Sequence, residues 1–262
     1  MRLINKKALV TGSSRGIGRA VALQLAKEGA EVVIHYQKNK EEAEKVAETI
    51  RENGGRCYIL QADLFDYTQA IELGEEAWEL SRGIDFLINN AGVSYKKHFL
   101  DTTPEDVDYF TNINFKSTLL LTQTIAKKMA ADKVEGSIYT ITSINGIQPG
   151  PGFSVYGATK GALETLMKGV ALELAPHNIK VNTLAVGAVE TDINAAVWQD
   201  AEKQKIVNSY IPMGRFGKAE EVAAVLCDLL SSGSYITGST VKIDGGWLLK
   251  SGYQNPIVYS GK

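Results

Sequence analysis

The stretch ALVTGSSRGIGRA, residues 8–20, passes from a short apolar run through a glycine-rich turn into a segment with the apolar period of a helix. Its glycines, Gly12, Gly16 and Gly18, have the spacing G-x-x-x-G-x-G. Glycines between a strand and a helix allow a tight turn and let backbone N–H groups and the helix N-terminus meet a pyrophosphate. A glycine-rich turn without a ligand has the same residue types, but this position between strand and helix favours a dinucleotide site.

The same alternation of a short apolar run and a longer helical segment continues along the chain. After the strand at 7–12, strands are expected at 31–36, 57–62, 84–90, 136–143, 179–186 and 239–244, and helices at 17–28, 41–52, 68–80, 104–131, 155–175 and 220–230. Seven strands alternating with helices predict an α/β fold of the Rossmann type, a doubly wound, seven-stranded parallel sheet with helices on both faces. The strands are almost continuously apolar, as expected when both faces are covered.

The composition favours one domain. The chain has 262 residues, of which 44% are hydrophobic, and no repeat or Pro/Ser-rich linker divides it. We therefore expect residues 1–262 to form a single dinucleotide-binding and catalytic domain. Residues 187–217 form a long insertion after the sixth strand, with exposed-looking Val197 and Trp198. This insertion is predicted to be a substrate lid.

Charge and composition exclude several classes of partner. A net charge of −2 gives no basic surface for nucleic acid or an anionic membrane. The sequence shows no apolar run of the roughly 18 residues that a membrane helix needs, and no signal-peptide pattern at its start, so a cytoplasmic protein with a small-molecule substrate is expected. The two cysteines and three histidines have no metal-ligand spacing, so no metal site is predicted.

The end of the second predicted strand bears on the choice of cofactor. A site specific for NAD normally has an acid there, which holds the ribose 2′-hydroxyl. Residues 34–40, IHYQKNK, contain no acid, and the first carboxylate is Glu41. Arg15 in the glycine loop and Lys38 can instead neutralise a 2′-phosphate. The charges thus favour NADP(H) over NAD(H), although Lys38 can equally be a solvated loop lysine.

A lysine shares the apolar face of a predicted helix at SVYGATKGAL, residues 154–163. At about 100° per residue, one face within about 40° of a common direction holds Tyr156, Lys160, Leu163, Met167, Val170 and Leu174. A free tyrosine has a pKa near 10. Lowering this pKa by about 3 units needs about 4 kcal/mol of interaction energy, which a nearby ammonium in a partly dry site can supply. The stretch therefore predicts a proton-transfer pair, with a helix-end tyrosine and a snorkelling lysine as the alternative.

Further motifs resolve this choice. TGSSRGIG resembles the cofactor loop of the short-chain dehydrogenase/reductase family, NNAG (residues 89–92) its strand-four motif and YGATK its Tyr-x-x-x-Lys active site. Ser143 lies thirteen residues before Tyr156, as the family's catalytic serine does, and Asn114 in NFKSTLLL fits the family's helix asparagine. The resemblance covers essentially the whole chain and implies hydride transfer between an alcohol or carbonyl and a nicotinamide, without a metal.

Carried over to this chain, the resemblance implies that Tyr156 is the general acid/base, and that Lys160 lowers its pKa and binds the nicotinamide ribose. It also implies that Ser143 orients the substrate oxygen and that Asn114 holds a water that relays protons towards Lys160. Hydrogen bonding within a turn or helix bend is the alternative role for Asn114, as it is for the asparagines of NNAG.

The resemblance also implies a set of cofactor contacts. Asp63 would contact the adenine amine, Asn90 and Gly92 would line the adenosine ribose, and Thr191 would touch the carboxamide. The full expected set is Gly12, Ser14, Arg15, Gly16, Ile17, Gly18, Tyr36, Lys38, Asp63, Leu64, Asn90, Ala91, Gly92, Tyr156, Lys160, Gly187, Val189 and Thr191. Val186 replaces the proline that the family usually has before Gly187, so the loop backbone there is expected to be less rigid.

The substrate is less constrained by the sequence. Residues 191–223 and the tail from 245 to 262 look more like the sugar 1-dehydrogenases, which act on glucose or rhamnose, than like the 3-oxoacyl-carrier-protein reductases. Residues 32–55 look equally like the reductases. Lys96, Lys97 and His98 either meet a polar ligand or form a solvated loop. The family resemblance further implies a homotetramer with the helix at 155–175 in an interface, and a non-catalytic NADP(H)-binding sensor is the alternative of another class.

Overall fold

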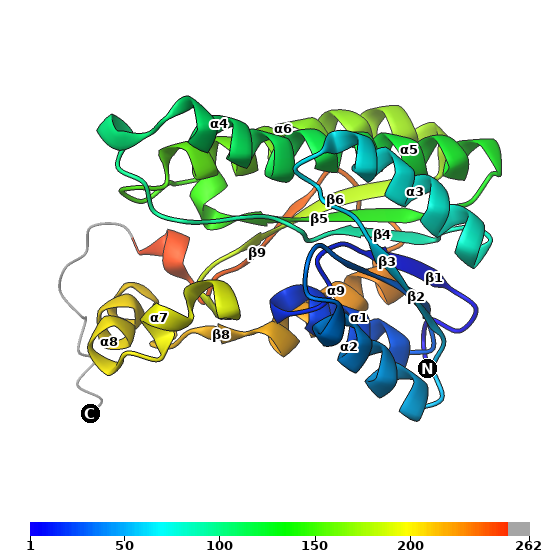
Figure 1. Cartoon of the computed structure of the whole chain (residues 1–262), viewed down its shortest axis with the longest axis horizontal. Coiled ribbons are helices and arrows are strands. Elements are labelled where there is room, and N and C mark those ends of the chain that lie inside the picture. The colour runs from blue at the N-terminus through cyan, green and yellow to red at the C-terminus, as the bar shows by residue number, and fades with distance from the viewer. Residues whose placement is uncertain (251–262) are drawn as a thin grey trace, which may run out of the picture.

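A single seven-stranded parallel sheet forms the centre of the molecule (Figure 1). The computed structural model describes residues 1–250. The sheet has the order β3-β2-β1-β4-β5-β6-β9. Its strands are β1 (Lys7–Val10), β2 (Glu31–Tyr36), β3 (Cys57–Gln61), β4 (Phe86–Asn89), β5 (Ser137–Ser143), β6 (Lys180–Val186) and β9 (Thr240–Ile243). The predicted α/β, doubly wound fold is confirmed.

Helices cover both faces of this sheet, as Figure 1 shows. One face packs against α1 (Gly16–Lys27), α2 (Lys40–Glu52) and α9 (Ala219–Ser232), and the other against α3 (Tyr67–Ser81), α5 (Ser117–Ala131) and α6 (Ser154–Leu174). Strand residues alternate between the two cores: Ala8 and Val10 belong to the first and Leu9 to the second. Burial on both faces is the reason for the continuous apolar runs.

The predicted helix at 104–131 has a more complex structure. It consists of α4 (Pro104–Phe110), a π-helical turn (Thr111–Lys116) and α5. A capping box between Thr103 and Asp106 begins α4. The π-helical turn inserts extra backbone into the helix, which re-aims the side chains on that turn.

The order of the strands reverses at β1. The chain runs outward through β2 and β3, then crosses back to β4 on the other side of β1. Because all seven strands are parallel, the loops that follow β1, β4, β5 and β6 meet at one edge. Open α/β sheets bind ligands at the carboxyl ends of strands beside such a switch point.

The long segment after β6 contains β7 (Val189–Glu190), α7 (Ala195–Trp198), α8 (Ala201–Tyr210) and β8 (Gly217–Lys218). β7 and β8 pair as a separate two-stranded sheet, which the sequence did not suggest, and Figure 1 shows α7 and α8 beyond the edge of the main sheet. The expectation that Val197 and Trp198 are exposed is wrong: both are half-buried, because the Trp198 indole N–H donates to the Thr191 carbonyl at 2.9 Å. Among residues 1–250, every helix is too short or too polar to cross a membrane.

Candidate active site

The glycine loop after β1 has the shape of an anion cradle. Gly12 and Gly16 adopt φ of +62° and +54°, a left-handed backbone that side chains disfavour. A Cβ on Gly18 would lie 2.3 Å from the Gly12 carbonyl oxygen and 2.4 Å from Asn90 Nδ2, so only glycine fits. Within residues 1–250, no side chain caps α1 and its first turn holds no acid. Its first N–H groups therefore remain free for an anion.

A threonine and an asparagine join this loop to the loop after β4. Thr11 Oγ1 accepts hydrogen bonds from the backbone N–H groups of Asn90 and Ala91, both at 2.9 Å. In return, Asn90 Nδ2 donates to the Thr11 carbonyl at 2.8 Å and the Gly12 carbonyl at 3.2 Å. Thr11 was not among the predicted residues, because its role depends on a contact with a segment 79 residues away in the chain.

A buried histidine supports the same loop. His35 Nδ1 accepts from the Gly12 N–H at 2.9 Å, and Nε2 lies 3.1 Å from the Ala62 carbonyl, to which it donates in the matching tautomer. Burial lowers the pKa of His35 to about 4, so the ring is neutral near neutral pH. In the sequence, His35 stood out only as a histidine without metal-ligand spacing, so this role was not predicted. A neutral histidine that bridges two backbone groups leaves no local pattern.

The predicted adenosine contacts gather at the ends of β2 and β3. Asp63 accepts from Gln37 Nε2 at 2.8 Å and from the Phe65 N–H at 3.0 Å, and Tyr36 is half-buried beside them. The other predicted residues at this end contact the rest of the protein through apolar side chains or backbone atoms. Leu64 is buried in the core, Ile17 packs against the core, and the Ser14 carbonyl accepts from the Arg19 guanidinium.

Among the described residues, several cations at this end take part in no ion pair. Arg15 and Lys38 are exposed and take part in no ion pair within the described residues. Arg19, by contrast, pairs with Glu42 at 2.6 Å, and Lys45 pairs with the same carboxylate. Arg15 and Lys38, with the neighbouring exposed Lys40, are thus cations available for a phosphate.

The predicted catalytic residues converge at the carboxyl ends of β4 and β5. Ser143 ends β5, and Tyr156 lies in the first turn of α6. The amine of Lys160, which is only 6% exposed, donates to the Ile141 carbonyl at 3.0 Å. A Cβ on Gly92 would lie 3.3 Å from Lys160 Nζ and 3.1 Å from Asn114 Oδ1, so these side chains meet over a glycine.

The pKa shifts at this site correct one prediction. Burial raises the pKa of the Tyr156 phenol, and hydrogen bonds from the hydroxyls of Ser143 and Ser94 only partly oppose it. Burial also lowers the pKa of Lys160 to about 8. The expectation that Lys160 lowers the pKa of Tyr156 is therefore wrong for the protein alone. Desolvation dominates both groups, and the Lys160 amine is directed to a backbone carbonyl.

Asn114 lies on the π-helical turn and is fully buried. Its Oδ1 accepts from the Val93 N–H at 2.8 Å, and its Nδ2 donates to the Val93 carbonyl at 3.0 Å and to Thr159 Oγ1 at 3.3 Å. The side chain therefore fixes the loop after β4 to α6. This is the structural role that the sequence left open as an alternative for Asn114.

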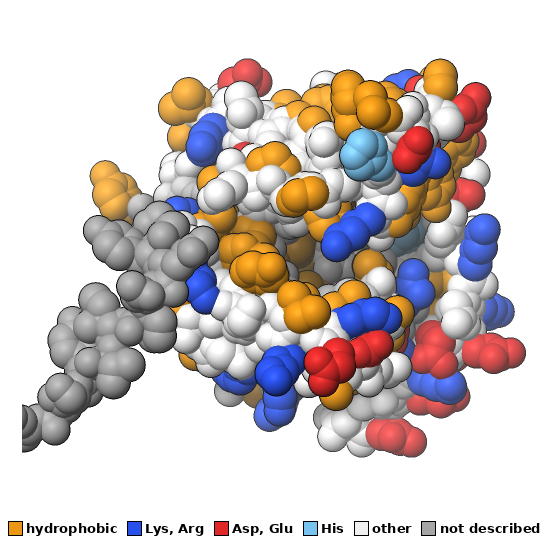
Figure 2. Space-filling view, turned by 90° about the vertical axis from the view of Figure 1, so that its left-hand side faces the viewer, with side chains coloured by type: hydrophobic (Ala, Val, Ile, Leu, Met, Phe, Trp, Pro, Cys, Tyr) orange, Lys and Arg blue, Asp and Glu red, His pale blue; other side chains and the backbone are white. Residues whose placement is uncertain are grey.

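Aromatic rings surround Tyr156. The ring centroids of Phe110 and Phe153 lie 6.2 Å and 5.9 Å from its own, and Tyr95 stacks on Phe110 at 4.4 Å. None of these three rings was among the predicted site residues. Figure 2 shows this end of the molecule, where hydrophobic and basic side chains surround a hollow. Lys96 lies 5.7 Å from the Phe153 ring centroid, so it is not simply solvated.

The segment after β6 approaches the glycine loop. A Cβ on Gly16 would lie 3.5 Å from Thr191 Cγ2, and Val189 is buried in the core. Val186 pairs with Ser143 on one side and Ile243 on the other, and the Gly187 N–H donates to the Ile243 carbonyl at 2.9 Å. The ladder thus pairs the backbone at Val186 on both sides, and the expected lower rigidity of the loop that follows stays a prediction.

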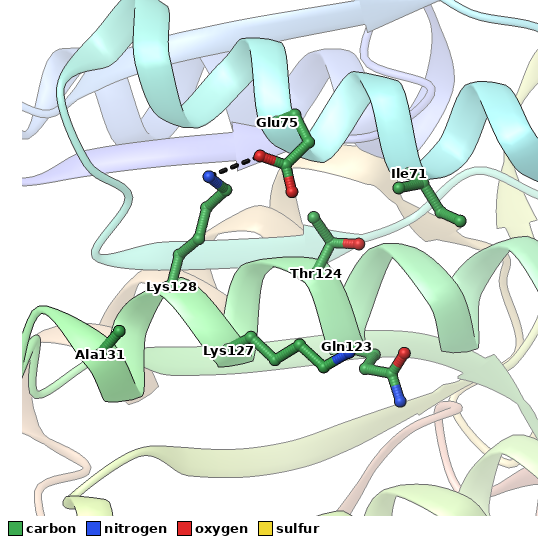
Figure 3. Close-up of a pocket in the computed structure, with 7 residues that line it drawn as sticks. All are labelled: Ile71, Glu75, Gln123, Thr124, Lys127, Lys128 and Ala131. Carbon is green, nitrogen blue, oxygen red and sulfur yellow. Dashed lines mark ion pairs between the residues drawn. The ribbon is translucent and has the colours of Figure 1, made fainter.

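A cavity of about 320 Å³ lies elsewhere, between α3 and α5 (Figure 3). It is lined by Ile71, Glu75, Gln123, Thr124, Lys127, Lys128 and Ala131. Glu75 and Lys128 form an ion pair across it at 2.5 Å. The lining residues of α5 lie near the carboxyl end of this helix, which runs antiparallel to the strands. The cavity therefore lies near the amino ends of the strands, away from Tyr156. It is not part of the candidate site.

Within residues 1–250, no group of three or more His, Cys, Asp or Glu side chains could hold a metal ion.

Known proteins are similar to this chain in sequence and in structure. Residues 12–248 match a family model described as enoyl-(acyl carrier protein) reductase. The chain is 35% identical to the L-rhamnose 1-dehydrogenase (NADP(+)) of Thermoplasma acidophilum, over 93% of this chain and 96% of that protein. It is 39% identical to a 3-oxoacyl-acyl-carrier-protein reductase of Aquifex aeolicus, over 94% and 98%. It is 37% identical to human dehydrogenase/reductase SDR family member 4, over 93% and 88%.

Solved structures agree with these relatives. A short chain dehydrogenase from Burkholderia cenocepacia in complex with NADP superposes with a TM-score of 0.88 at 35% identity, covering 95% of this chain and all of that one. A short-chain dehydrogenase/reductase from Serratia marcescens gives a TM-score of 0.89 at 34% identity, covering 94% and 99%.

His35 makes a prediction about stability and pH. Its folded pKa of about 4 lies below the ordinary 6.5, so its contribution is present above pH 6.5 and is lost as the pH falls through 6.5 towards 4. Between about pH 7.5 and about pH 4.5, the wild type should lose about 2 to 3 kcal/mol more unfolding free energy than His35→Gln. Denaturant titrations at both pH values measure this. The exposed His98→Gln variant should follow the wild type, and parallel losses in all three proteins would contradict the assignment.

Proposed function

The chain belongs to the short-chain dehydrogenase/reductase family and is an NAD(P)-dependent oxidoreductase, and we propose that it acts as an aldose 1-dehydrogenase that uses NADP(H). The observation that carries the proposal is the convergence of Ser143, Tyr156 and Lys160 beside the glycine loop. Similarity to an L-rhamnose 1-dehydrogenase over nearly the whole chain supports an aldose as substrate. None of the relatives reported supports the alternative of a non-catalytic sensor.

The residues at the switch point fit a nicotinamide dinucleotide. The left-handed glycines, the absence of space for a Cβ on Gly18 and the uncapped start of α1 leave a cradle of backbone N–H groups for a pyrophosphate. Thr191, across from Gly16, would border the same cradle. When bound, the nicotinamide supplies or accepts the hydride.

We assign proton transfer at the substrate oxygen to Tyr156. Burial raises its pKa, so the phenol holds its proton near neutral pH and suits donation to a carbonyl during reduction. The Ser143 hydroxyl, fixed by accepting from the Asn145 N–H at 3.1 Å, orients the substrate oxygen. In oxidation the phenol must first lose its proton. Lys160, with a pKa of about 8, is the adjacent group that can exchange protons in this range.

The proposed preference for NADP(H) rests on the surface charge at the adenosine end. β2 ends without an acid, and Arg15 and Lys38 are exposed cations without ion-pair partners in the described part of the chain. A 2′-phosphate would supply their counter-charge. The NADP named in the Burkholderia cenocepacia complex and in the rhamnose dehydrogenase supports this choice.

A second function has support of its own. The 39% identity to a 3-oxoacyl-acyl-carrier-protein reductase makes an acyl thioester the competing substrate class.

We retain the lid role of residues 187–217, the single domain, the cytoplasmic location and the homotetramer as predictions. Leu172, 79% exposed on α6, would be covered if this helix formed the expected interface.

A substrate panel separates the two classes. Purified protein is assayed with L-rhamnose, D-glucose, simple secondary alcohols and an acetoacetyl thioester, each with NADP(H) and NAD(H), by following reduced nicotinamide absorbance. We expect kcat/KM for an aldose with NADP⁺ to exceed that for the other alcohols by tenfold or more, about 1.4 kcal/mol of transition-state binding. A larger kcat/KM for the thioester would establish the reductase instead.

The mechanism predicts that Tyr156→Phe loses turnover but retains the cofactor. Removing one hydroxyl from the half-buried ring deletes the proton donor, which typically costs about 10² to 10⁴ in rate, and leaves the glycine cradle intact. Turnover on the best substrate and NADPH fluorescence titration measure the two effects. Turnover equal to that of the wild type would exclude Tyr156 as the acid/base.

The cofactor proposal predicts the effect of Arg15→Ala. Loss of a charge-assisted hydrogen bond, worth about 1.5 to 3 kcal/mol, should weaken NADPH binding by about tenfold or more and leave NADH binding unchanged. Dissociation constants for both cofactors give the comparison. Arg51→Ala, which removes a partly exposed cation at the far end of α2, is the matched control. An equal effect of Arg15→Ala on both cofactors would disprove recognition of the 2′-phosphate by this residue.

A further inference from the structure

Arg19, in the first turn of α1, binds both carbonyl groups of the turn that precedes this helix. Its guanidinium donates two hydrogen bonds to the Ser14 carbonyl, from Nε at 3.0 Å and from Nη2 at 2.8 Å. Its backbone N–H donates to the Arg15 carbonyl at 3.1 Å. One residue of the helix therefore fixes two successive peptide groups of the glycine loop.

The orientation of these two peptide groups decides what the loop presents to a ligand. The peptide bonds of this loop are trans, and the carbonyl and the N–H of a trans peptide group point in opposite directions. With the Ser14 and Arg15 carbonyls bound by Arg19, the N–H groups that follow them point away from this side chain. These are the N–H groups of Arg15 and Gly16, and neither has an acceptor within the described residues. Both are therefore free to bind an anion.

A carboxylate on the next helix holds the guanidinium in this orientation. Glu42 Oε2 lies 2.6 Å from Arg19 Nη2, and Glu42 Oε1 lies 2.6 Å from Lys45 Nζ. Glu42 belongs to the first turn of α2, and its N–H donates to the side chain of the N-cap residue Asn39. A guanidinium has five donors in a rigid planar fork, so one arginine can bind a carbonyl and a carboxylate together. The glycine loop is thereby joined to the start of α2.

These contacts distinguish Arg19 from Arg15, although both are arginines of the same loop and helix. Arg15 is exposed and takes part in no ion pair within the described residues, so its charge is available to a ligand. Arg19 is half-buried, and its guanidinium is committed to the Ser14 carbonyl and the Glu42 carboxylate. Arg19 is thus placed to shape the loop, whereas Arg15 is placed to contact a phosphate.

We propose that Arg19 is a positioning residue for cofactor binding. Anchored by Glu42, it turns the peptide groups on both sides of Arg15 so that their N–H groups face the pyrophosphate. Without Arg19, the Ser14 carbonyl is free to turn into the cradle, where it would repel phosphate oxygens. The ligand class is a nucleoside diphosphate ester, with or without a 2′-phosphate. The inference rests on the proposed cofactor site at the switch point, and neither the substrate nor the preference for NADP(H) enters it.

Two nucleotide fragments separate the pyrophosphate from the 2′-phosphate. ADP-ribose has the pyrophosphate and no 2′-phosphate, and adenosine 2′-monophosphate has the 2′-phosphate and no pyrophosphate. Calorimetry measures the dissociation constants of both fragments for the wild type and Arg19→Ala. We expect Arg19→Ala to bind ADP-ribose about tenfold more weakly, because the N–H groups lose their alignment, and to bind adenosine 2′-monophosphate within about twofold of the wild type.

Three further variants test the geometry. Glu42→Gln weakens the anchor and should reduce ADP-ribose affinity by about threefold. Arg19→Lys keeps the charge but cannot reproduce the fork, so it should retain most of the loss. Arg56→Ala is the matched control, since Arg56 pairs with Glu31 at 3.1 Å at the amino end of β2, and it should change neither affinity. Full affinity in Arg19→Lys would show that charge alone is needed and would overturn the positioning role.

A kinetic comparison distinguishes positioning from a general loss of structure. In Arg19→Ala the KM for NADPH should rise about tenfold, while kcat at saturating cofactor stays within about twofold of the wild type. Equal losses for both fragments, a loss confined to adenosine 2′-monophosphate, or no loss would each reject the proposal. Arg19 would then stabilise the loop generally, bind the 2′-phosphate itself, or be unnecessary. Because ADP-ribose binding needs neither a substrate nor a 2′-phosphate, failure of the proposed aldose or NADP(H) preference would be seen separately.

Discussion

The hydrogen bonds of Asn90 to the backbone of Thr11 and Gly12 are the constraint on which the rest of the site depends. They join β1, which leads into the cofactor cradle, to β4, which leads into the loop that reaches the catalytic residues. The same amide excludes any side chain at Gly18, since a Cβ there would lie 2.4 Å from Asn90 Nδ2. Close approach of α1 and precise placement of the loop after β4 therefore have one cause. At the switch point of a doubly wound sheet, the connections that follow two neighbouring strands, here β1 and β4, lie on opposite faces of the sheet. The hydrogen bonds of Asn90 join the two connections where they diverge.

The buried amine of Lys160 is the second constraint on the structure of the site. Lys160 is almost fully buried and gives one of its three donors to the Ile141 carbonyl, which offsets only part of its desolvation. Its pKa of about 8 is the result. By this reasoning an apolar residue there would make the fold more stable, which supports the proposed role of Lys160 in proton transfer. Gly92 gives the amine its space, because a Cβ would lie 3.3 Å from Nζ.

Local patterns predicted the fold and proposed a catalytic set, and through-space contacts account for what they missed. The glycine spacing, the alternation of strands and helices, and the shared face of Tyr156 and Lys160 all lie within short windows. The roles of Thr11 and His35 depend on partners that only folding brings near. The sign of the Tyr156 pKa shift was wrong for a related reason: the sequence shows which charge is near in the chain, but desolvation depends on the complete packing.

The choice of substrate depends on loop segments whose side chains are not fixed by packing against the sheet. The loop after β4 is tied down through Tyr95 and Asp106, the loop before α6 through the Gly150 N–H and Asn145 Oδ1 at 3.0 Å, and the segment after β6 through Trp198 and the Thr191 carbonyl. Each is secured by few contacts outside the two cores, so its side chains can change without disturbing the sheet. One scaffold can then carry relatives named for a sugar and for an acyl thioester at 35% and 39% identity. Overall identity consequently cannot separate these substrates, whereas side chains in these three segments can.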